Sequence, residues 1–276
     1  MTKRFARDAR LVGARAAGLA MLLSLAACGG GLLGEDKPDT PAVDETPKVK
    51  TTAENAGAGI GLANCTTPSG GRIHFKIANT VLAVPGNIVT DAIPAGMAPP
   101  LTKEKVVAEV QSQFSQGIGC PGKPMDTGLL LVKEKLDHPL LEGNIGLLAL
   151  PPGGITERFA KETQRLQNDP AKGCQPIPES DLIACAGKEK RGDAVIEVLY
   201  VVTTNKAEKM ANGGPLAARC TREGQAIKGC NLVDQLQGGL AIDASLKSGR
   251  YTTEGLRGAL DTAVGRINGL RVPSGT

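Results

Sequence analysis

Few side chains of this sequence are suited to acid–base chemistry near neutral pH. The chain contains two histidines, His74 and His138, and histidine is the usual general acid or base in this pH range. His74 stands beside Lys76 in an alternating segment, and His138 stands between Asp137 and Pro139 in a turn-like sequence. Neither is accompanied by a nucleophile elbow, a zinc-binding histidine pair or a phosphate-binding loop. We therefore expect structural or surface roles for both histidines, and no catalytic residues.

Carboxylates alone would suffice for one class of enzyme. A glycoside hydrolase needs only two of them, so the sequence leaves that activity open. Such enzymes usually hold sugars on aromatic platforms, however, and beyond residue 27 the aromatic side chains all fall in or beside strand or helix patterns: Phe75, Phe114, Phe159, Tyr200 and Tyr251. We expect core packing for these side chains and a protein that is not an enzyme.

Six cysteines follow the N-terminal segment, and an even number in an exported chain indicates three disulfides. Proximity in the sequence favours Cys174–Cys185 and Cys220–Cys230, each of which brackets a plausible hairpin. This leaves Cys65–Cys120 by elimination. The sequence has no CxxC pair, and neither histidine stands at ligand spacing from another candidate, so we expect no metal site and no cofactor.

Two segments are candidate contact surfaces for a partner. Residues 188–193 read Lys-Glu-Lys-Arg-Gly-Asp, and we expect a charged loop tip there, with Lys188, Lys190 and Arg191 as candidate partner-binding residues. Residues 119–124 form the second candidate, which prolines and the expected disulfide make rigid. A solvated turn without function is the alternative for the first segment.

The N-terminal segment has the three parts of an export signal. Five basic residues and one acidic residue are followed by an apolar stretch over residues 16–25, too short to cross a bilayer, and then by Leu25-Ala26-Ala27-Cys28. This order resembles the signal peptide and lipobox of bacterial lipoproteins, with an ordinary secretory signal as the alternative. The resemblance implies cleavage before Cys28 and lipid attachment to its thiol. Because Gly29 follows instead of an aspartate, it also implies anchoring in the outer membrane, with the domain in the periplasm and surface exposure left open.

The charge of the chain changes when this segment is removed. The full sequence has 32 basic and 28 acidic residues, a net charge of +4. Residues 1–27 carry five basic and one acidic residue, which is also +4, so the remaining chain is neutral. Nucleic-acid binding needs a surplus of Lys and Arg on one face, so we do not expect it. The membrane is expected to be contacted through the N-terminal lipid.

Composition divides the chain beyond the signal peptide (1–27) into a tether and a domain. Residues 28–58 combine low hydrophobicity with Pro38, Pro41 and Pro47, which is typical of a disordered, extended linker. Residues 59–276 have the pattern of a packed protein and are enough for one sizeable domain or two small ones. A division into two similar modules near residue 151 is expected, although the chain shows no internal repeat.

Periodicity predicts the elements of this domain. Strand patterns occupy residues 73–77, 80–84, 128–132, 145–150, 194–202 and 239–243, and helix patterns follow Thr102 and occupy residues 155–166 and 256–270. The order predicts an α+β fold in which amphipathic helices pack on one face of antiparallel sheets, stapled by disulfides.

The overall layout is similar to that of periplasmic immunity lipoproteins, which neutralise toxins delivered by type VI secretion systems. The shared features are the lipobox, the polar tether, a short hairpin ending in Val84-Pro85, and cysteine hairpins before a C-terminal helix. The resemblance implies a non-enzymatic binding protein that docks over the active site of a toxin. It is a resemblance of layout, so no functional residue is carried over. The alternative is an envelope assembly or structural lipoprotein with a resident protein partner.

The lipidation of Cys28 is directly testable. Intact-mass analysis of the membrane fraction is expected to show a lipidated chain that begins at Cys28. A Cys28→Ser variant is expected to leave the membrane, because stable anchoring needs two or more acyl chains. A variant that still fractionates entirely with membranes would contradict this prediction.

Overall fold

The computed structural model describes Cys65 and residues 71–98, 100–150, 154–170, 173–191, 194–223 and 226–273. The signal peptide, Cys28 and the tether lie outside these residues, so their roles stay predictions.

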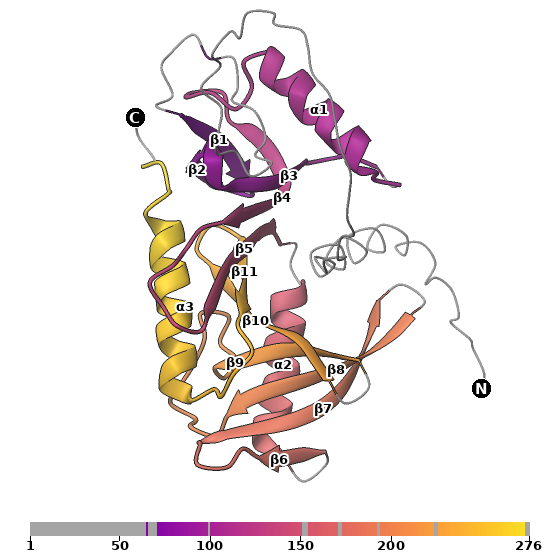
Figure 1. The fold of residues 1–276 in the computed structure, drawn as a ribbon, viewed down its shortest axis with the longest axis vertical. Coiled ribbons are helices and arrows are strands. Elements are labelled where there is room, and N and C mark those ends of the chain that lie inside the picture. The colour runs from indigo at the N-terminus through magenta and orange to yellow at the C-terminus, as the bar shows by residue number, and fades with distance from the viewer. Residues whose placement is uncertain are drawn as a thin grey trace, which may run out of the picture.

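Within the described part, the chain forms strands and helices in a mixed order (Figure 1). The elements are β1 (Arg72–Ile77), β2 (Thr80–Pro85), the short 3₁₀ helix η2 (Gly86–Ile88), β3 (Val89–Pro94), α1 (Lys103–Ser115), β4 (Met125–Lys133), β5 (Leu141–Ala149), α2 (Ile155–Asn168), β6 (Cys174–Pro176), β7 (Leu182–Arg191), β8 (Ala194–Thr203), β9 (Ala217–Glu223), β10 (Ala226–Leu236), β11 (Leu240–Leu246) and α3 (Thr253–Asn268).

All the strands of the described part join one 11-stranded sheet. Its order is β2-β1-β4-β5-β11-β10-β9-β8-β7-β6, and β3 pairs with β4 beside this path. Neighbouring strands are antiparallel, except that β1 and β4 are parallel. The predicted α+β class is therefore confirmed. The pairing of β5 with β11 carries the sheet across the expected boundary near residue 151, and a division into two modules stays a prediction.

The β1–β2 hairpin forms one end of the sheet. Ile73, Phe75 and Ile77 are fully buried and alternate with outward-facing residues, as the two-residue period predicts. The outer edge of β2 is covered by the chain that follows α3: the Ala83 N–H donates to the Leu270 carbonyl at 2.8 Å. This cover satisfies backbone groups that an open edge strand would expose.

The helices begin and pack as their apolar spacing predicts. The Thr102 hydroxyl accepts a hydrogen bond from the Lys105 N–H and caps α1. Val106, Val110 and Phe114 form the buried face of α1.

Helix α3 buries the predicted residues Leu256, Leu260 and Ile267, whereas Val264 is only partly buried. The helix ends at Asn268, so the predicted Leu270 lies just after it and is buried as well. Buried alanines complete the apolar face of this helix, so it packs closely enough to offset the weak helix propensity of its glycines.

Two helices contact β8 through different side chains. Phe159 of α2 lies 6.0 Å from Tyr200, measured between ring centroids. Thr253 of α3 hydrogen-bonds Thr203, with 3.1 Å between the hydroxyl oxygens. Tyr200 and Thr203 are an odd number of residues apart, so their side chains leave opposite faces of the strand. These contacts do not establish the expected packing of all helices on one face, which stays a prediction.

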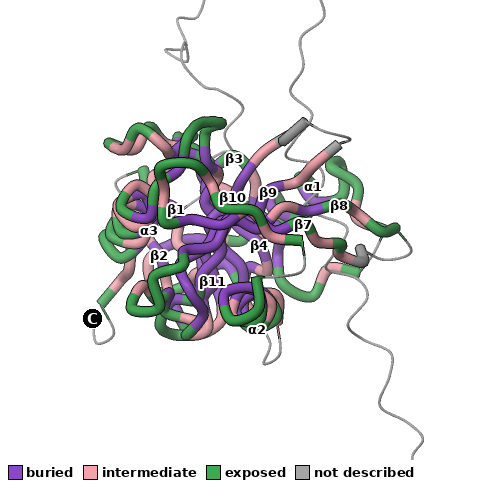
Figure 2. Tube along the Cα trace, turned by 90° about the horizontal axis from the view of Figure 1, so that it is seen from below, coloured by how far each residue is buried: buried purple, intermediate pink, exposed green. Residues whose placement is uncertain are grey.

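Buried residues run through the middle of the molecule along the strands, and exposed residues gather on loops and on the outer sides of helices (Figure 2). No helix of the described part is long and apolar enough to cross a membrane.

Three disulfides hold the fold, with the pairings expected from the sequence. Cys174–Cys185 links the opposed residues of β6 and β7, and Cys220–Cys230 links the opposed residues of β9 and β10. Cys65–Cys120 ties the chain before β1 to the loop between α1 and β4, with 5.5 Å between the Cα atoms. Both short pairs therefore staple adjacent strands in the half of the sheet that contains β8.

Removing one short staple should destabilise the domain. A Cys174→Ala, Cys185→Ala double variant is expected to lose about 3 kcal/mol of unfolding free energy, because a closed loop of this length restricts the unfolded chain by about that amount. Urea denaturation measures the loss, and non-reducing peptide mapping of the natural protein checks the pairings. Six alkylatable thiols in protein taken from cells would contradict the disulfide framework.

Candidate functional site

The predicted charged loop is largely a strand. Strand β7 continues to Arg191, where it pairs with Ala194 of β8, whereas the pairing of β8 with β9 ends at Val198. Residues 188–191 and 194–197 therefore extend as a two-stranded ribbon beyond the β8–β9 pairing. We call this ribbon the arm, and it is the orange projection at the side of Figure 1. The expectation of a loop over residues 188–191 was wrong because the two-residue period continues through the charged residues.

The arm has both charged and apolar exposed residues. Lys188 is exposed and lies opposite Glu197 in the β7–β8 register. Val195 is 63% exposed. Lys190 and Arg191 are also in β7, so the three predicted binding residues lie on one strand.

Glu189 anchors the arm to the sheet. Its carboxylate accepts hydrogen bonds from Arg219 Nε at 2.8 Å and Nη2 at 2.7 Å, and a third from the Tyr200 hydroxyl at 2.7 Å. The side chain of Arg219 is 9% exposed and that of Glu189 is 26% exposed. A bidentate pair with so little solvent around it is stronger and more directional than a surface ion pair.

Tyr200 reaches Glu189 because Gly187 leaves room for its ring. A Cβ atom at Gly187 would lie 2.8 Å from Cε2 of Tyr200, so a larger residue would displace the ring. Burial, and then the hydrogen bond to Glu189, raise the pKa of Tyr200 far above its usual value. The phenol therefore stays protonated and donates its hydrogen bond throughout the physiological pH range.

A signal for this anchor is present in the sequence. The alternation Cys185, Gly187, Glu189 places these three residues on one face of a continued strand. The pairing with Arg219 could not be found in this way, because it depends on the register of β8 with β9, and cross-strand partners are not encoded by local periodicity.

The second candidate segment borders a pocket at the other end of the sheet. This pocket has a volume of about 460 Å³ and is lined by residues of the β1–β2 hairpin, of the segment after Cys120 and of the chain after α3: His74, Asn79, Thr80, Val81, Pro121, Gly122, Pro124, Arg271, Val272 and Pro273. The structure thus brings His74 to the proline-rich candidate segment. Burial, and then the nearby charge of Arg72, lower the pKa of His74, so its imidazole is neutral at pH 7.

Arg271 forms part of the pocket wall but is turned towards the sheet. It forms an isolated bridge with Leu82, whose side chain is fully buried, and antiparallel partners share a face. Its Nη2 donates to the Gln237 carbonyl at 3.2 Å, and its buried Nε has no hydrogen-bond partner within the described part. Besides Arg271, the pocket wall combines prolines and valines with the neutral imidazole of His74 and the polar residues Asn79 and Thr80.

His138 has a structural position. Its Nδ1 accepts a hydrogen bond from the Leu140 N–H at 3.3 Å, which closes the turn before β5. Its ring packs against α3 at Gly258, where an added Cβ would lie 3.0 Å from Nε2. The described residues contain no cluster of His, Cys, Asp or Glu able to hold a metal ion.

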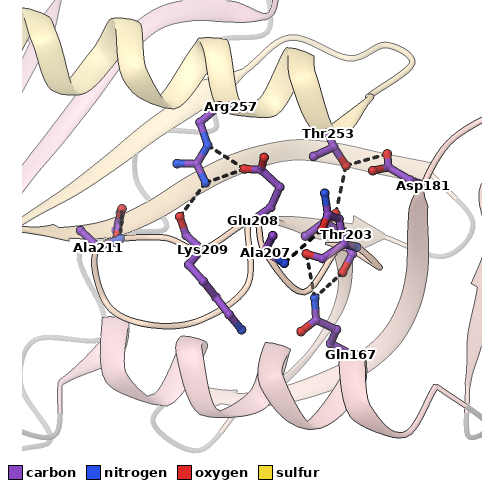
Figure 3. A network of polar contacts seen from close by, with 11 residues as sticks. Gln167, Asp181, Thr203, Ala207, Glu208, Lys209, Ala211, Thr253 and Arg257 are labelled. Carbon is purple, nitrogen blue, oxygen red and sulfur yellow. Dashed lines mark hydrogen bonds and ion pairs between the residues drawn. The ribbon is translucent and has the colours of Figure 1, made fainter.

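A polar network between α2 and α3 holds the loop that joins β8 to β9 (Figure 3). Arg257 of α3 donates two hydrogen bonds to Glu208 Oε2, at 3.0 and 2.9 Å. Thr253 donates to Asp181 at 2.6 Å, and Gln167 of α2 donates to the Thr203 carbonyl at 2.8 Å. These partners lie within the fold, so the network positions the base of β8 and β9.

Asp234 adds a buried contact to the same loop. Its carboxylate accepts from the N–H groups of Ala211 at 2.9 Å and of Asn212 at 3.0 Å. Burial raises the pKa of Asp234, and these backbone hydrogen bonds oppose the shift. The carboxylate acts as a fixed acceptor for the loop.

Truncation of the anchor should be costly. An Arg219→Ala variant is expected to lose about 2–3 kcal/mol of unfolding free energy, because it leaves the half-buried charge of Glu189 without its main partner. An Arg250→Ala variant is the matched control, since Arg250 pairs with Glu179 at an exposed site and should lose less than about 1 kcal/mol. Equal losses, measured by urea denaturation, would contradict the proposed anchoring.

Comparison of this chain with protein-family models, curated proteins and solved structures found no match, so its function is argued from its own residues.

Proposed function

We propose that this protein is a non-enzymatic, membrane-tethered binding lipoprotein of the bacterial envelope, and most specifically an immunity protein against a toxin delivered to the periplasm. The arm is its contact surface. The observation that carries the proposal is the anchoring of Glu189 by Arg219 and Tyr200, which fixes the arm to a buried part of the sheet.

The anchor also shapes the charge of the arm. Since Glu189 is matched by Arg219, the remaining charges of residues 188–191 are the cations Lys188, Lys190 and Arg191. Glu197 on β8 lies opposite Lys188, so the arm keeps a surplus of positive charge, although the chain beyond residue 27 is neutral as a whole. This local surplus favours an acidic partner. It would mainly increase the rate of association, because complementary charge steers encounter.

Stiffness supports a binding role in a second way. Cys174–Cys185 and Cys220–Cys230 staple the strands on either side of β8, close to the level of Tyr200. A contact surface that is already ordered loses less conformational freedom on binding than a flexible loop. For an immunity protein, which must block a toxin promptly, both rapid association and low ordering entropy are useful.

The alternative proposal is an envelope assembly or structural lipoprotein with a resident partner. Gene deletion separates the two. For immunity, deletion is expected to make cells sensitive to a toxin-bearing sister strain, and the anchored domain is expected to restore resistance. An envelope defect in pure culture, without competitors, would favour the resident-partner alternative. Crosslinking in intact cells identifies the partner in either case.

Charge reversal of the arm tests the proposed contact surface. The variant Lys188→Glu, Lys190→Glu, Arg191→Glu is expected to slow association with the crosslinked partner by at least about tenfold at low salt, because it reverses the steering charge. The control is Lys103→Glu, Lys105→Glu, Lys206→Glu, which changes the same net charge at exposed positions of α1 and of the loop after β8.

Association rates measured by surface plasmon resonance decide the outcome. The control variant should associate at close to the natural rate, and both variants should keep the natural melting temperature. An unchanged rate for the arm variant would reject the arm as the contact surface and would make the segment after Cys120 the better candidate.

A further inference from the structure

Along the arm, the outer edge of β7 pairs with no strand of the described part of the chain. The β6–β7 register ends at Cys174↔Cys185, and the Ala186 N–H then donates to the Gly173 carbonyl at 3.0 Å. No described strand pairs with this edge beyond that hydrogen bond. The backbone of β7 between Gly187 and Arg191 therefore has one side paired with β8 and the other side unpaired by any described strand.

The backbone groups on the open side belong to Lys188 and Lys190. In an antiparallel ladder, alternate residues direct their N–H and C=O groups to the same side of the strand. Because the Ala186 N–H points away from β8, those of Lys188 and Lys190 do so as well. Two of the three cations of the arm thus carry the unpaired backbone groups.

Because the outward-facing backbone groups belong to two cationic residues, we infer that the arm binds an extended acidic segment of its partner by strand addition to β7. The inference rests on the proposed function, since it specifies how the arm binds. The partner strand pairs with the N–H and C=O groups of Lys188 and Lys190, and the positive charge of residues 188–191 attracts its carboxylates. Backbone pairing supplies affinity in this mode of recognition, and the side chains supply selectivity.

The positive charges of Lys188 and Lys190 also disfavour pairing of this edge with a second copy of the arm. Lysines on an edge strand are a common obstacle to edge-to-edge association. If two copies of the arm paired through this edge, Lys188 and Lys190 of one copy would face the lysines of the other, and like charges in opposed positions are destabilising. The edge therefore discriminates by attraction to an acidic strand and by repulsion of a second copy.

Amide hydrogen exchange in the full-length protein is a direct test of strand addition. The probe is acetyl-Glu-Val-Glu-Val-Glu-Val-amide, and the comparison peptide has lysine in place of each glutamate. In the free protein, the amides of Lys188 and Lys190 are expected to exchange faster than those of Glu189 and Arg191, which face β8. With the acidic peptide, exchange at Lys188 and Lys190 should slow by at least about tenfold while Glu189 and Arg191 change little.

Two matched reagents separate backbone pairing from charge. An acidic peptide N-methylated at its two central residues, one on each edge, keeps its charge but should bind at least about tenfold more weakly, because methylation removes donors and adds bulk at the edge. A Lys190→Pro variant removes one outward N–H and should weaken binding in the same way. Lys103→Gln, Lys105→Gln is the charge control and should bind like the natural protein.

The possible results are decisive in both directions. Lack of binding by the acidic peptide at about 1 mM, equal binding of the acidic and basic peptides, or insensitivity to N-methylation would overturn strand addition. Vesicles containing anionic lipid that protect the same amides equally well would also overturn it in favour of a membrane surface. If the arm charge reversal still slows the natural partner while Lys188 and Lys190 stay unprotected in that complex, the proposed function survives and only strand addition fails.

Discussion

The hydrogen-bonding groups at the edges of the 11-stranded sheet are the constraint on which the rest of the structure depends. An open sheet has two edges, and every unpaired backbone group there must find water, another segment or a partner. At the β2 end, Leu270 and Val272 pair with the edge and bring the end of α3 with them. At the other end, β6 covers only the first residues of β7, and no other described strand pairs with that edge along the arm. The two ends thus solve the same problem in opposite ways.

The two ends also differ in the side chains that hold them. The covered end packs its hairpin with apolar residues, whereas the open end is held by Glu189, Arg219 and Tyr200 on the face of the sheet that α2 contacts through Phe159. Between them, Glu208 and Arg257 hold the loop after β8 against α3. Without the hydrogen bonds of Glu189 to Arg219 and Tyr200, the arm would fray, since an isolated two-stranded hairpin is only marginally stable in water.

The sequence predicted the parts of the fold that depend on local periodicity and on cysteine proximity. The predicted strand segments overlap observed strands, and the faces of α1 and α3 are buried as expected, because an apolar face can be identified from spacing alone. Strand β3 was not predicted, since Asp91 and Pro94 interrupt its pattern. The sheet order, the parallel pairing of β1 with β4, and the Arg219 anchor depend on contacts between distant segments, which local patterns do not encode.

The candidate site also combines features that local sequence patterns predict with features that depend on distant contacts. The charged composition of residues 188–193 predicts a loop, whereas Lys188, Lys190 and Arg191 lie in strand β7. The two-residue period continues past Gly187 to Arg191 and places Glu189 on the opposite face from Lys188 and Lys190. The neighbouring charges of this segment therefore have different roles, and only the strand period distinguishes them.

The anchor itself is a poor way to gain stability, and this bears on its role. A partly buried ion pair loses most of its Coulombic attraction to desolvation, and apolar residues of similar size often replace such a pair without loss. The α2 side of β8 already has an aromatic contact that would suit an apolar replacement. What apolar packing would not supply is direction, because the fork of Arg219 and the hydroxyl of Tyr200 fix both oxygens of one carboxylate. Fixing Glu189 in this way fixes the direction of the strand edge that follows it, which is what recognition through backbone groups requires.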